Sequence, residues 1–315
     1  MRDVVIIGGG LSGLAAALEL ESLKIPYRLI EVKNRLGGSI ATGQRDGFTF
    51  DSGAFAFPRA ADWSFLADFE LEDGLIPVND WHLGRMVAFK HGTQMLTDAL
   101  AKRITGTVIH RMAVSSLGDF EGRFALCMEN GLMWEAGALI VAAPVRHVER
   151  MFRTLAPEFS LRLLDYHYDT ITRVAVGYPS EAIRDPGRMV WGDIATAFYY
   201  TVDHPDRVPP GYTLIQMGVR FPLERTTPEV LVRTLQEHLH WPENPALVNV
   251  STWAEADPIP PHSRNFRENM TALESLLPEG VALAGSDFNG LGLADRIAGG
   301  RSAARKIAAY LENKK

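Results

Sequence analysis

The stretch that decides the fold is residues 4–13, Val4-Val5-Ile6-Ile7-Gly8-Gly9-Gly10-Leu11-Ser12-Gly13. Residues 4–7 are β-branched, as in strands that are buried on both faces of a parallel sheet. Gly8, Gly10 and Gly13 follow at the spacing GxGxxG. In a dinucleotide-binding turn the first glycine permits the tight turn, the second lets the backbone approach a pyrophosphate, and the third lets helix and strand pack closely. The stretch therefore predicts a strand, a tight turn and the start of a helix.

The following residues complete a βαβ unit. Residues 14–23 are strong helix formers with leucines at helical spacing, and Pro26 ends the pattern. Residues 27–30 predict a second strand that ends at Glu31, eighteen positions beyond Gly13. An acid there accepts hydrogen bonds from the adenosine ribose, while the pyrophosphate binds free N–H groups at the positive end of the helix. We therefore expect a dinucleotide site made of Gly8, Gly10, Leu11, Ser12, Gly13 and Glu31.

Composition narrows the remaining function classes. The chain has 315 residues, 46% of them hydrophobic, which is enough for one large core or two linked ones. A formal net charge of −6 makes nucleic-acid binding an unlikely role. The single cysteine, Cys127, cannot form an internal disulfide or a thiolate metal site, so we expect no metal and a reducing, cytoplasmic location. No signal-peptide pattern or transmembrane segment is expected, and the protein should be soluble.

The segment after Glu31 carries a family resemblance. Residues 31–42 resemble the pattern E-x-x-x-R-x-G-G-x-x-x-[ST] of the flavoprotein superfamily that includes amine oxidases, protoporphyrinogen oxidases, phytoene desaturases and renalase. The resemblance implies FAD, with the backbone at Gly37 and Gly38 passing the flavin's phosphate and ribityl chain. Residues 50–54 resemble that superfamily's D-x-G segment, which runs along the flavin; a simple turn is the alternative. The cofactor residues that the resemblance implies here are Val32, Lys33, Arg35, Gly37, Gly38 and Ser39.

The far end of the chain resembles the same superfamily. Residues 281–287 predict a short strand ending in glycine and an acid, and residues 295–311 predict a helix after a glycine-rich loop. In the resembling family this block completes the flavin site, and the helix dipole stabilises negative charge near the isoalloxazine C2 carbonyl. The alternative is an ordinary βα unit that closes the sheet. The resemblance implies four further cofactor residues, Gly285, Asp287, Leu293 and Ala294.

Weaker resemblances lie between the two ends. Residues 89–100 resemble a G-G-x-x-x-L-x-x-A-L helix with His91 in place of the first glycine, and the segment that runs to Val114 resembles a strand that packs on adenine. Residues 139–144 resemble a strand ending in A-x-P. Alternation at residues 170–176 and 213–219 predicts antiparallel strands, and residues 230–239 predict an amphipathic helix.

These elements together predict an α/β fold of two interleaved lobes. The first is a Rossmann-like FAD-binding lobe, a parallel sheet plus a β-meander, assigned to residues 1–58, 86–147 and 278–315. The second is an α+β substrate lobe built on an antiparallel sheet, assigned to residues 59–85 and 148–277.

The chain departs from the resembling proteins in features that bear on the substrate and on the attachment of the cofactor. Classical amine oxidases place a lysine in the substrate lobe, but this chain has none between Lys102 and Lys306. No cysteine stands near residues 285–290, where some amine oxidases bind flavin covalently, so the FAD should be noncovalent. Residues 57–89 follow a short path where protoporphyrinogen oxidases insert a large membrane-associated region, and in compactness the chain resembles renalase. Residues 253–258, in contrast, resemble the protoporphyrinogen oxidase segment W-x-x-A-x-P.

The expected activity is that of an FAD-dependent oxidase or dehydrogenase. Its substrate would be a small molecule, an amine, a porphyrinogen-like ring or a dihydro-heterocycle, and its electron acceptor O2, a quinone or another oxidant. Two alternatives stay open, a noncatalytic binder like the Rab-escort and GDP-dissociation-inhibitor proteins, and a redox-neutral flavin isomerase or mutase. The sequence defines no oligomeric state.

Candidate residues for the substrate site are few. Trp253, Tyr199 and His91 are the catalytic or pocket candidates, although core or sheet packing is the more common role of such aromatic residues. An obvious general base is not required, because hydride transfer to a flavin mainly needs the substrate held close to it. Further candidates, each with a structural or surface role as the alternative, are Phe198 and Tyr200 as pocket walls, His147 as an acid or base, and Arg45, Arg59, Arg146 and Arg188 as carboxylate binders.

Overall fold

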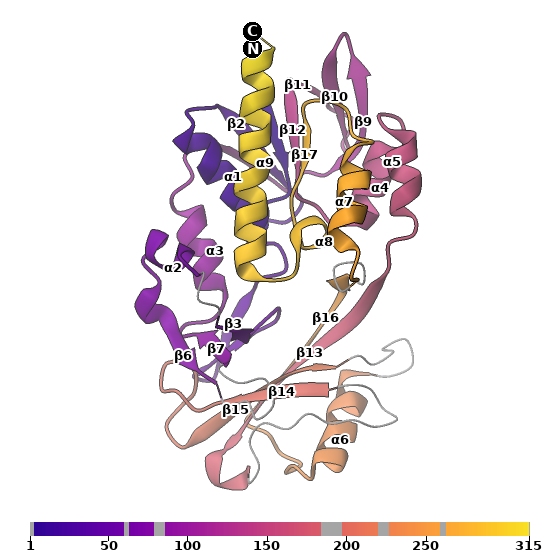
Figure 1. The fold of residues 1–315 in the computed structure, drawn as a ribbon. Coiled ribbons are helices and arrows are strands. Elements are labelled where there is room, and N and C mark those ends of the chain that lie inside the picture. Colours follow the sequence, from indigo (N-terminus) through magenta and orange to yellow (C-terminus); the bar gives the residue numbers. More distant parts are fainter. Residues whose placement is uncertain are drawn as a thin grey trace. The chain divides into compact units, whose positions relative to one another are not determined.

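The computed structural model describes residues 3–59, 63–78, 86–183, 197–219, 227–258 and 263–314. These residues form two compact units that interleave along the chain (Figure 1). Unit 1 comprises residues 1–38, 97–167 and 258–315, and unit 2 comprises residues 39–96 and 168–257.

Unit 1 is built on a parallel sheet with the strand order β17-β12-β1-β2-β8. The register pairs Val4 with Tyr27 of β2 on one side and with Ala138 of β12 on the other. All four residues of β1 are buried, as the β-branched run predicts. The strands are β1 (Val4–Ile7), β2 (Tyr27–Glu31), β8 (Thr107–His110), β12 (Ala138–Val141) and β17 (Val281–Leu283).

Two helices pack together against this sheet, α1 (Leu11–Ser22) and α9 (Leu293–Asn313) (Figure 1). Their backbones approach closely at Gly300, where an added Cβ would lie 2.2 Å from the Ser12 carbonyl oxygen. Alanines on both helices and the apolar side chains of β1, β2 and β12 form one buried cluster. Residues from both ends of the sequence therefore share one core.

The rest of unit 1 is a β-meander and short helices. The meander has the order β11-β10-β9, made of β9 (Val114–Phe120), β10 (Arg123–Met128) and β11 (Met133–Ala136). Inward and outward side chains alternate along β10, and Cys127 is half-buried there. The helices are α4 (Val145–Phe152), α5 (Pro157–Leu163), α7 (Phe266–Glu274) and α8 (Ser286–Asn289), while α3 (Gln94–Ala101) begins in unit 2 and continues into unit 1.

Unit 2 contains an antiparallel sheet of order β14-β15-β13-β16 with different partners on its two faces. Val174, Val176 and Met217 pack on helix α6 (Pro228–Leu239), which begins after the N-capping side chain of Thr227. Ala175 and Leu214, which alternate with them, pack on Phe48 and other apolar residues. Because successive side chains of a strand point to opposite faces of its sheet, the residues that pack on α6 and those that pack on Phe48 lie on opposite faces. The strands are β13 (Tyr168–Pro179), β14 (Ala197–Val202), β15 (Tyr212–Val219) and β16 (Leu247–Pro258).

Two smaller sheets complete the described part of unit 2. They are the hairpin of β3 (Thr42–Arg45) and β4 (Phe48–Asp51), and the sheet of order β5-β7-β6 with β5 (Phe57–Pro58), β6 (Leu75–Pro77) and β7 (Met86–Phe89). Short helical segments are α2 (Phe65–Asp68), η1 (Glu72–Gly74) and η2 (Ser180–Ala182). Among the described residues, we find no helix that combines the length and apolar character needed to cross a bilayer.

The predicted fold class is confirmed, with local differences. The helix expected over residues 295–311 begins earlier, at Leu293, and α8 forms within the loop expected before it. The side chain of Asn289 explains why α8 forms within this loop, because its Oδ1 accepts a hydrogen bond from Gly285 N at 2.9 Å. The resemblance of residues 89–100 implied a helix over this range, but α3 begins at Gln94, because Phe89 ends β7 and Gly92 has a φ of +93°.

The compact units and the two predicted lobes have different boundaries. Residues 39–58 and 86–96, assigned above to the FAD-binding lobe, pack within unit 2 because β4 buries Phe48 and Phe50 against the antiparallel sheet. Residues 148–167 pack within unit 1, where α5 lies against α4. The assignment of one lobe to cofactor and the other to substrate stays a prediction.

The Glu149 carboxylate, on α4, makes pH-dependent contacts with Arg153 at the end of the same helix and with Ser160 on α5. The hydrogen bond from Arg153, at 2.7 Å, is the main reason that the pKa of Glu149 lies below its usual 4.5, with help from Ser160. A depressed pKa contributes stability that is fully present above pH 4.5 and is lost as the pH falls through the lower folded-state pKa.

Glu149→Gln should therefore weaken the acid dependence of unfolding. In urea titrations at a series of pH values, the variant should lose less stability than the wild type as the pH falls below 4.5. Glu158→Gln, an exposed carboxylate on α5, is the matched control. Identical acid profiles for wild type and Glu149→Gln would mean that the contact does not persist in solution.

Candidate functional site

The carboxyl ends of the parallel strands bring several predicted cofactor residues together in unit 1. After β1 the chain continues to α1 and then to β2 on one side, whereas β12 lies on the other side of β1. This reversal of strand order is the topological switch point at which open α/β sheets bind ligands. Gly8 follows β1, Glu31 ends β2 and Gly285 follows β17 by two residues, so all three stand at this edge.

The three glycines of the turn differ in what surrounds them. Gly8 has a φ of +106°, and a Cβ on it would lie 2.5 Å from the Ala142 carbonyl oxygen. A Cβ on Gly13 would lie 1.9 Å from the Gly8 carbonyl oxygen. A Cβ on Gly10, in contrast, would meet just one atom of the described residues within 4 Å, Gly38 Cα at 3.9 Å. Packing within the chain explains Gly8 and Gly13, but the space beside Gly10 is open.

Helix α1 begins beside this open space without a side-chain cap. Its N-cap residue is Gly10, which has no side chain that could accept a hydrogen bond. The first backbone N–H groups of a helix have no partner within it and carry the positive end of its dipole. Leu11, Ser12 and Gly13 supply these groups here. Such a helix end favours the binding of an anionic group, for example a phosphate or a pyrophosphate.

Glu31 is held in place by backbone donors. Its side chain is buried, Oε2 accepts a hydrogen bond from Gly9 N at 2.8 Å, and Oε1 accepts one from Lys33 N at 2.8 Å. A carboxylate has about four lone-pair sites, so each oxygen can still accept a ribose hydroxyl. The acid is therefore oriented at the glycine turn, as a dinucleotide site requires.

The loop after Glu31 folds back onto the glycine turn. Gly37 N donates to the Gly9 carbonyl oxygen at 2.8 Å. The Gly38 carbonyl oxygen accepts from both Lys33 Nζ, at 3.0 Å, and Arg35 Nη2, at 2.9 Å. Gly37 and Gly38 have φ values of +102° and +62°, which explains why both are glycine. Val32 is exposed on the same loop, and Ser39 continues the chain as the first residue of unit 2.

The segment of residues 285–294, near the end of the sequence, begins at the same edge of the parallel sheet. Gly285 has a φ of +133°, and no atom in the described part of the chain lies within 4 Å of the position its Cβ would take. Leu293 and Ala294 begin α9, whose N-cap is Gly292, again without a capping side chain. Val114 stands at the start of β9, close in sequence to Met112, whose N–H donates to the Glu31 carbonyl oxygen at 3.1 Å.

Asp287 is engaged within the protein. Its buried carboxylate accepts from Val145 N and from Ser286 Oγ, both at 2.9 Å, and so caps the start of α4. Tyr166 donates to the Asp287 carbonyl oxygen. Burial, with the nearby Asp287 carboxylate, raises the pKa of Tyr166 above its usual value, so its hydroxyl stays protonated. The implied contact of Asp287 with a cofactor stays a prediction beside this structural role.

The family models decide the classification. The model for a flavin containing amine oxidoreductase matches residues 65–308, which is most of the chain. The chain belongs to the flavin-containing amine oxidoreductase family. A second model, for an NAD(P)-binding Rossmann-like domain, matches residues 6–69 and covers the glycine turn.

Relatives of this amine oxidoreductase family member act on different molecules. The coproporphyrinogen III oxidase of Bacillus subtilis (strain 168) is 24% identical over 247 residues, which are 72% of this chain and 52% of that protein. The chain thus spans about half the length of the curated relatives it matches. Cyclohexylamine oxidase from Brevibacterium oxydans IH-35A has a TM-score of 0.72 at 14% identity, with 98% of this chain and 99% of that chain covered.

A third similar protein, from Exiguobacterium sp. 255-15, has a crystal structure that carries a provisional protoporphyrinogen oxidase name. It gives a TM-score of 0.82 at 16% identity and covers 98% of this chain and 99% of that chain. At these identities the two solved structures establish the shared fold.

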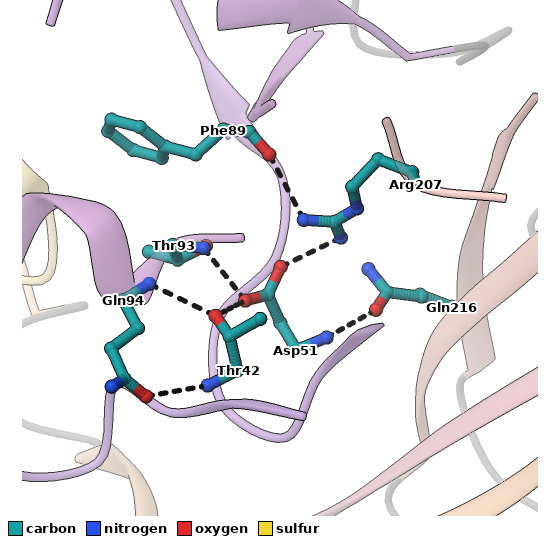
Figure 2. A network of polar contacts seen from close by, with 7 residues as sticks. All are labelled: Thr42, Asp51, Phe89, Thr93, Gln94, Arg207 and Gln216. Atoms are coloured by element: carbon teal, nitrogen blue, oxygen red, sulfur yellow. Dashed lines mark hydrogen bonds and ion pairs between the residues drawn. The ribbon is translucent and has the colours of Figure 1, made fainter. Parts of the chain in front are cut away.

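A polar network in unit 2 adds residues that the sequence did not single out (Figure 2). Asp51, in the segment that resembles D-x-G, forms an ion pair with Arg207 at 2.9 Å, and neither side chain is exposed. The Asp51 N–H donates to Gln216 Oε1 at 2.6 Å. Arg207 lies 156 positions from its partner, and nothing in its local sequence marks it as buried.

The structure describes the surroundings of some substrate-site candidates but not of others. The Trp253 indole, on β16, donates to the Ser52 carbonyl oxygen, which gives it a packing role in unit 2. His91 is exposed in the turn before α3. The side chain of Tyr199, with those of Phe198 and Tyr200, and all of Arg188 lie outside the part of the chain that the structure describes. His147, Arg59 and Arg146 are exposed, and Arg45 donates to the Val248 carbonyl oxygen.

Glu31→Gln should weaken FAD binding by roughly 1–3 kcal/mol, which is about five- to 150-fold in Kd. The reason is that the new amide turns a donor toward the N–H of Gly9 or of Lys33, and that the substitution removes the negative charge. Titration of apoprotein with FAD measures the change. Glu21→Gln is the matched control, because Glu21 also accepts two backbone N–H groups in unit 1, those of Thr105 and Gly106. Equal FAD affinity for Glu31→Gln and wild type would remove Glu31 from the site.

Proposed function

We propose that this protein is an FAD-dependent oxidoreductase that oxidises a small organic molecule. The observation that carries the proposal is the open space beside Gly10, at the uncapped end of α1 and next to the oriented carboxylate of Glu31. A helix end without a cap and a carboxylate that can accept hydroxyl groups fit the pyrophosphate and the adenosine ribose of a dinucleotide. Family membership supports a flavin as the redox group of that dinucleotide.

The residues proposed to hold FAD divide into three groups. Backbone N–H groups of Leu11, Ser12 and Gly13 would bind the pyrophosphate, and Glu31 would bind the ribose. The loop of residues 32–39 and Val114 would follow the adenosine and phosphate portions, and Gly285, Asp287, Leu293 and Ala294 would complete the flavin side. The cofactor would be held noncovalently. When bound, FAD accepts a hydride equivalent from a substrate positioned beside it.

The proposed substrate classes are a porphyrinogen-like ring, an amine and a dihydro-heterocycle. The names of the relatives support the first two, since they include a porphyrinogen oxidase and an amine oxidase. The absence of lysine between Lys102 and Lys306 disfavours a site of the classical monoamine oxidase type. O2, a quinone or another small oxidant would then take the electrons.

Cofactor content tests the first half of the proposal. Purified protein should be yellow, with a flavin absorption band near ~450 nm, and heat should release FAD rather than FMN. Colourless protein that binds no added FAD would contradict the proposal and favour a noncatalytic binder. Release of FMN alone would contradict the dinucleotide site.

Anaerobic mixing tests the second half. The FAD-loaded protein should bleach when it is mixed with a substrate, and the panel should contain porphyrinogens, amines and dihydronicotinamides. Reoxidation by O2 or a quinone then identifies the acceptor. Bound FAD that turns a substrate over without net reduction would instead favour a redox-neutral isomerase.

A further inference from the structure

The carboxylate of Asp51 is the hub of a buried network in unit 2 (Figure 2). Its Oδ1 accepts from Thr42 Oγ1 at 2.6 Å and from Thr93 N at 2.8 Å. Its Oδ2 accepts from Arg207 Nη2 at 2.9 Å, and the other end of the guanidinium, Nη1, donates to the Phe89 carbonyl oxygen at 3.0 Å. The carboxylate thus accepts hydrogen bonds from three segments of the chain: strand β3, the turn before α3, and the residues between β14 and β15.

The network connects sheets that share no strand pairing. Thr42 and Asp51 belong to the β3–β4 hairpin, Phe89 ends β7, and Gln216 lies on β15. The hairpin also caps the start of α3, because Gln94 N donates to Thr42 Oγ1 and Thr42 N donates to Gln94 Oε1, both at 3.1 Å. Arg207 is therefore the cation that joins the hairpin to the sheet containing β7.

The hairpin in turn fixes the segment next to the proposed cofactor loop. Ser52 N donates to the Ala41 carbonyl oxygen at 2.9 Å. A Cβ on Gly53 would lie 2.2 Å from the Ser39 carbonyl oxygen, so residues 39–41 and 51–53 are packed backbone against backbone. Ser39 directly follows the Gly37-Gly38 loop in the sequence. A shift of Asp51 would therefore move Ser39.

The energetics favour a geometric role for this ion pair. A buried ion pair contributes little net stability compared with apolar residues of the same size, because both charges lose their hydration. Among the described residues, Arg207 Nε also finds no hydrogen-bond partner, which adds to the cost. What an arginine offers instead is a rigid fork whose two ends bind acceptors at fixed directions.

We propose that Arg207 is a positioning residue for the cofactor: acting through Asp51, it holds residues 39–42 and 51–53 in the conformation that binds FAD. This inference rests on the proposed FAD binding. It assigns Arg207 no contact with substrate or cofactor, and predicts that loss of the fork loosens this segment while the sheet covered by α6 stays intact.

The first test uses apoprotein and needs no flavin. Hydrogen–deuterium exchange of Arg207→Lys, which keeps the charge but loses the fork, should show faster exchange at residues 39–53 and at Thr93. Exchange in α6 should match the wild type. Tyr178→Phe is the control, because it removes a buried hydroxyl that bonds the Pro242 carbonyl oxygen and Gln236 elsewhere in unit 2. Unchanged exchange at residues 39–53 in Arg207→Lys would overturn the inference.

The second test measures FAD affinity in a double-mutant cycle. Arg207→Met and Asp51→Asn should each raise the Kd for FAD at least about tenfold. In the double variant neither position carries a charge, so the increase in its Kd should be at least about fivefold smaller than the product of the two single-variant increases. The bound-flavin absorption bands should shift in the single variants and not in Tyr178→Phe. If Arg207→Met does not fold, Arg207→Gln, which is also neutral, replaces it in the cycle.

The two tests separate this inference from the proposed function. Wild-type protein that binds no FAD contradicts the proposed function, whatever the exchange data show. Wild type that binds FAD, with single variants of unchanged Kd and unchanged flavin spectrum, overturns the positioning role and leaves the proposed function standing. A fall in thermal stability alone, equal to that of Tyr178→Phe, would also overturn it.

Discussion

Gly10→Ala should abolish FAD binding while leaving the apoprotein folded. The added Cβ would point into the open space beside α1, where its nearest neighbour is Gly38 Cα at 3.9 Å. Gly10 has a φ of −74°, which alanine adopts without strain. The same methyl group would occupy the space through which a pyrophosphate reaches the helix N–H groups, so we expect the Kd for FAD to rise by roughly 100-fold or more.

The measurement is an FAD titration of apoprotein, combined with urea unfolding of the same samples. Gly118→Ala is the matched control, because a Cβ on Gly118, in the meander, meets none of the described residues within 4 Å and so, like a Cβ on Gly10, creates no clash. Both variants should unfold within about 1 kcal/mol of the wild type, since neither creates a clash. FAD affinity that survives in Gly10→Ala would show that the pyrophosphate does not pass Gly10.

Gly13→Ala should destabilise the apoprotein by about 3 kcal/mol or more. Its Cβ would lie 1.9 Å from the Gly8 carbonyl oxygen and 3.1 Å from the Gly8 carbonyl carbon, both of them backbone atoms. The turn cannot yield easily, because Gly8 itself lies against the Ala142 carbonyl oxygen. Helix propensity acts in the opposite direction, since alanine is favoured over glycine by about 1 kcal/mol inside a helix.

The sign of the stability change is therefore the decisive result for Gly13. Urea unfolding of apoprotein measures it without any contribution from FAD. Gly10→Ala serves as the comparison, as the same substitution three positions earlier in the same turn. A Gly13→Ala variant as stable as the wild type, or more stable, would contradict the close approach of α1 to the turn.

Local patterns in the sequence predicted the local geometry of the candidate site. Gly8, Gly13 and Glu31 were predictable because a strand, a glycine turn, a helix and an acid must follow one another within one βαβ unit. The role of Asp287 as a cap on α4 was not, because its partner, Val145, lies 142 positions away. A carboxylate at the end of a strand gives no sign of which backbone N–H it will meet.

The long-range partners of charged residues are equally hard to predict from local sequence. Arg45, Arg59, Arg146 and Arg188 were chosen as carboxylate binders by residue type alone, and the structure describes the first three as exposed. Arg207 stands in a polar, proline-rich stretch that is typical of a surface loop, yet its side chain is fully buried. Its burial follows from the distant Asp51, and charge pairing across 156 positions leaves no periodic signal.

The packing of α1 against α9 has a consequence for synthesis of the chain. Helix α1 is complete after residue 22, but the helix that covers it spans residues 293–313. Until that helix leaves the ribosome, the apolar side of α1 and of the parallel sheet has no partner, and exposed apolar surface of this kind aggregates. Unit 1 can therefore finish folding only once α9 has left the ribosome, and a truncation within α9 should be cleared by proteases rather than accumulate as a partial domain.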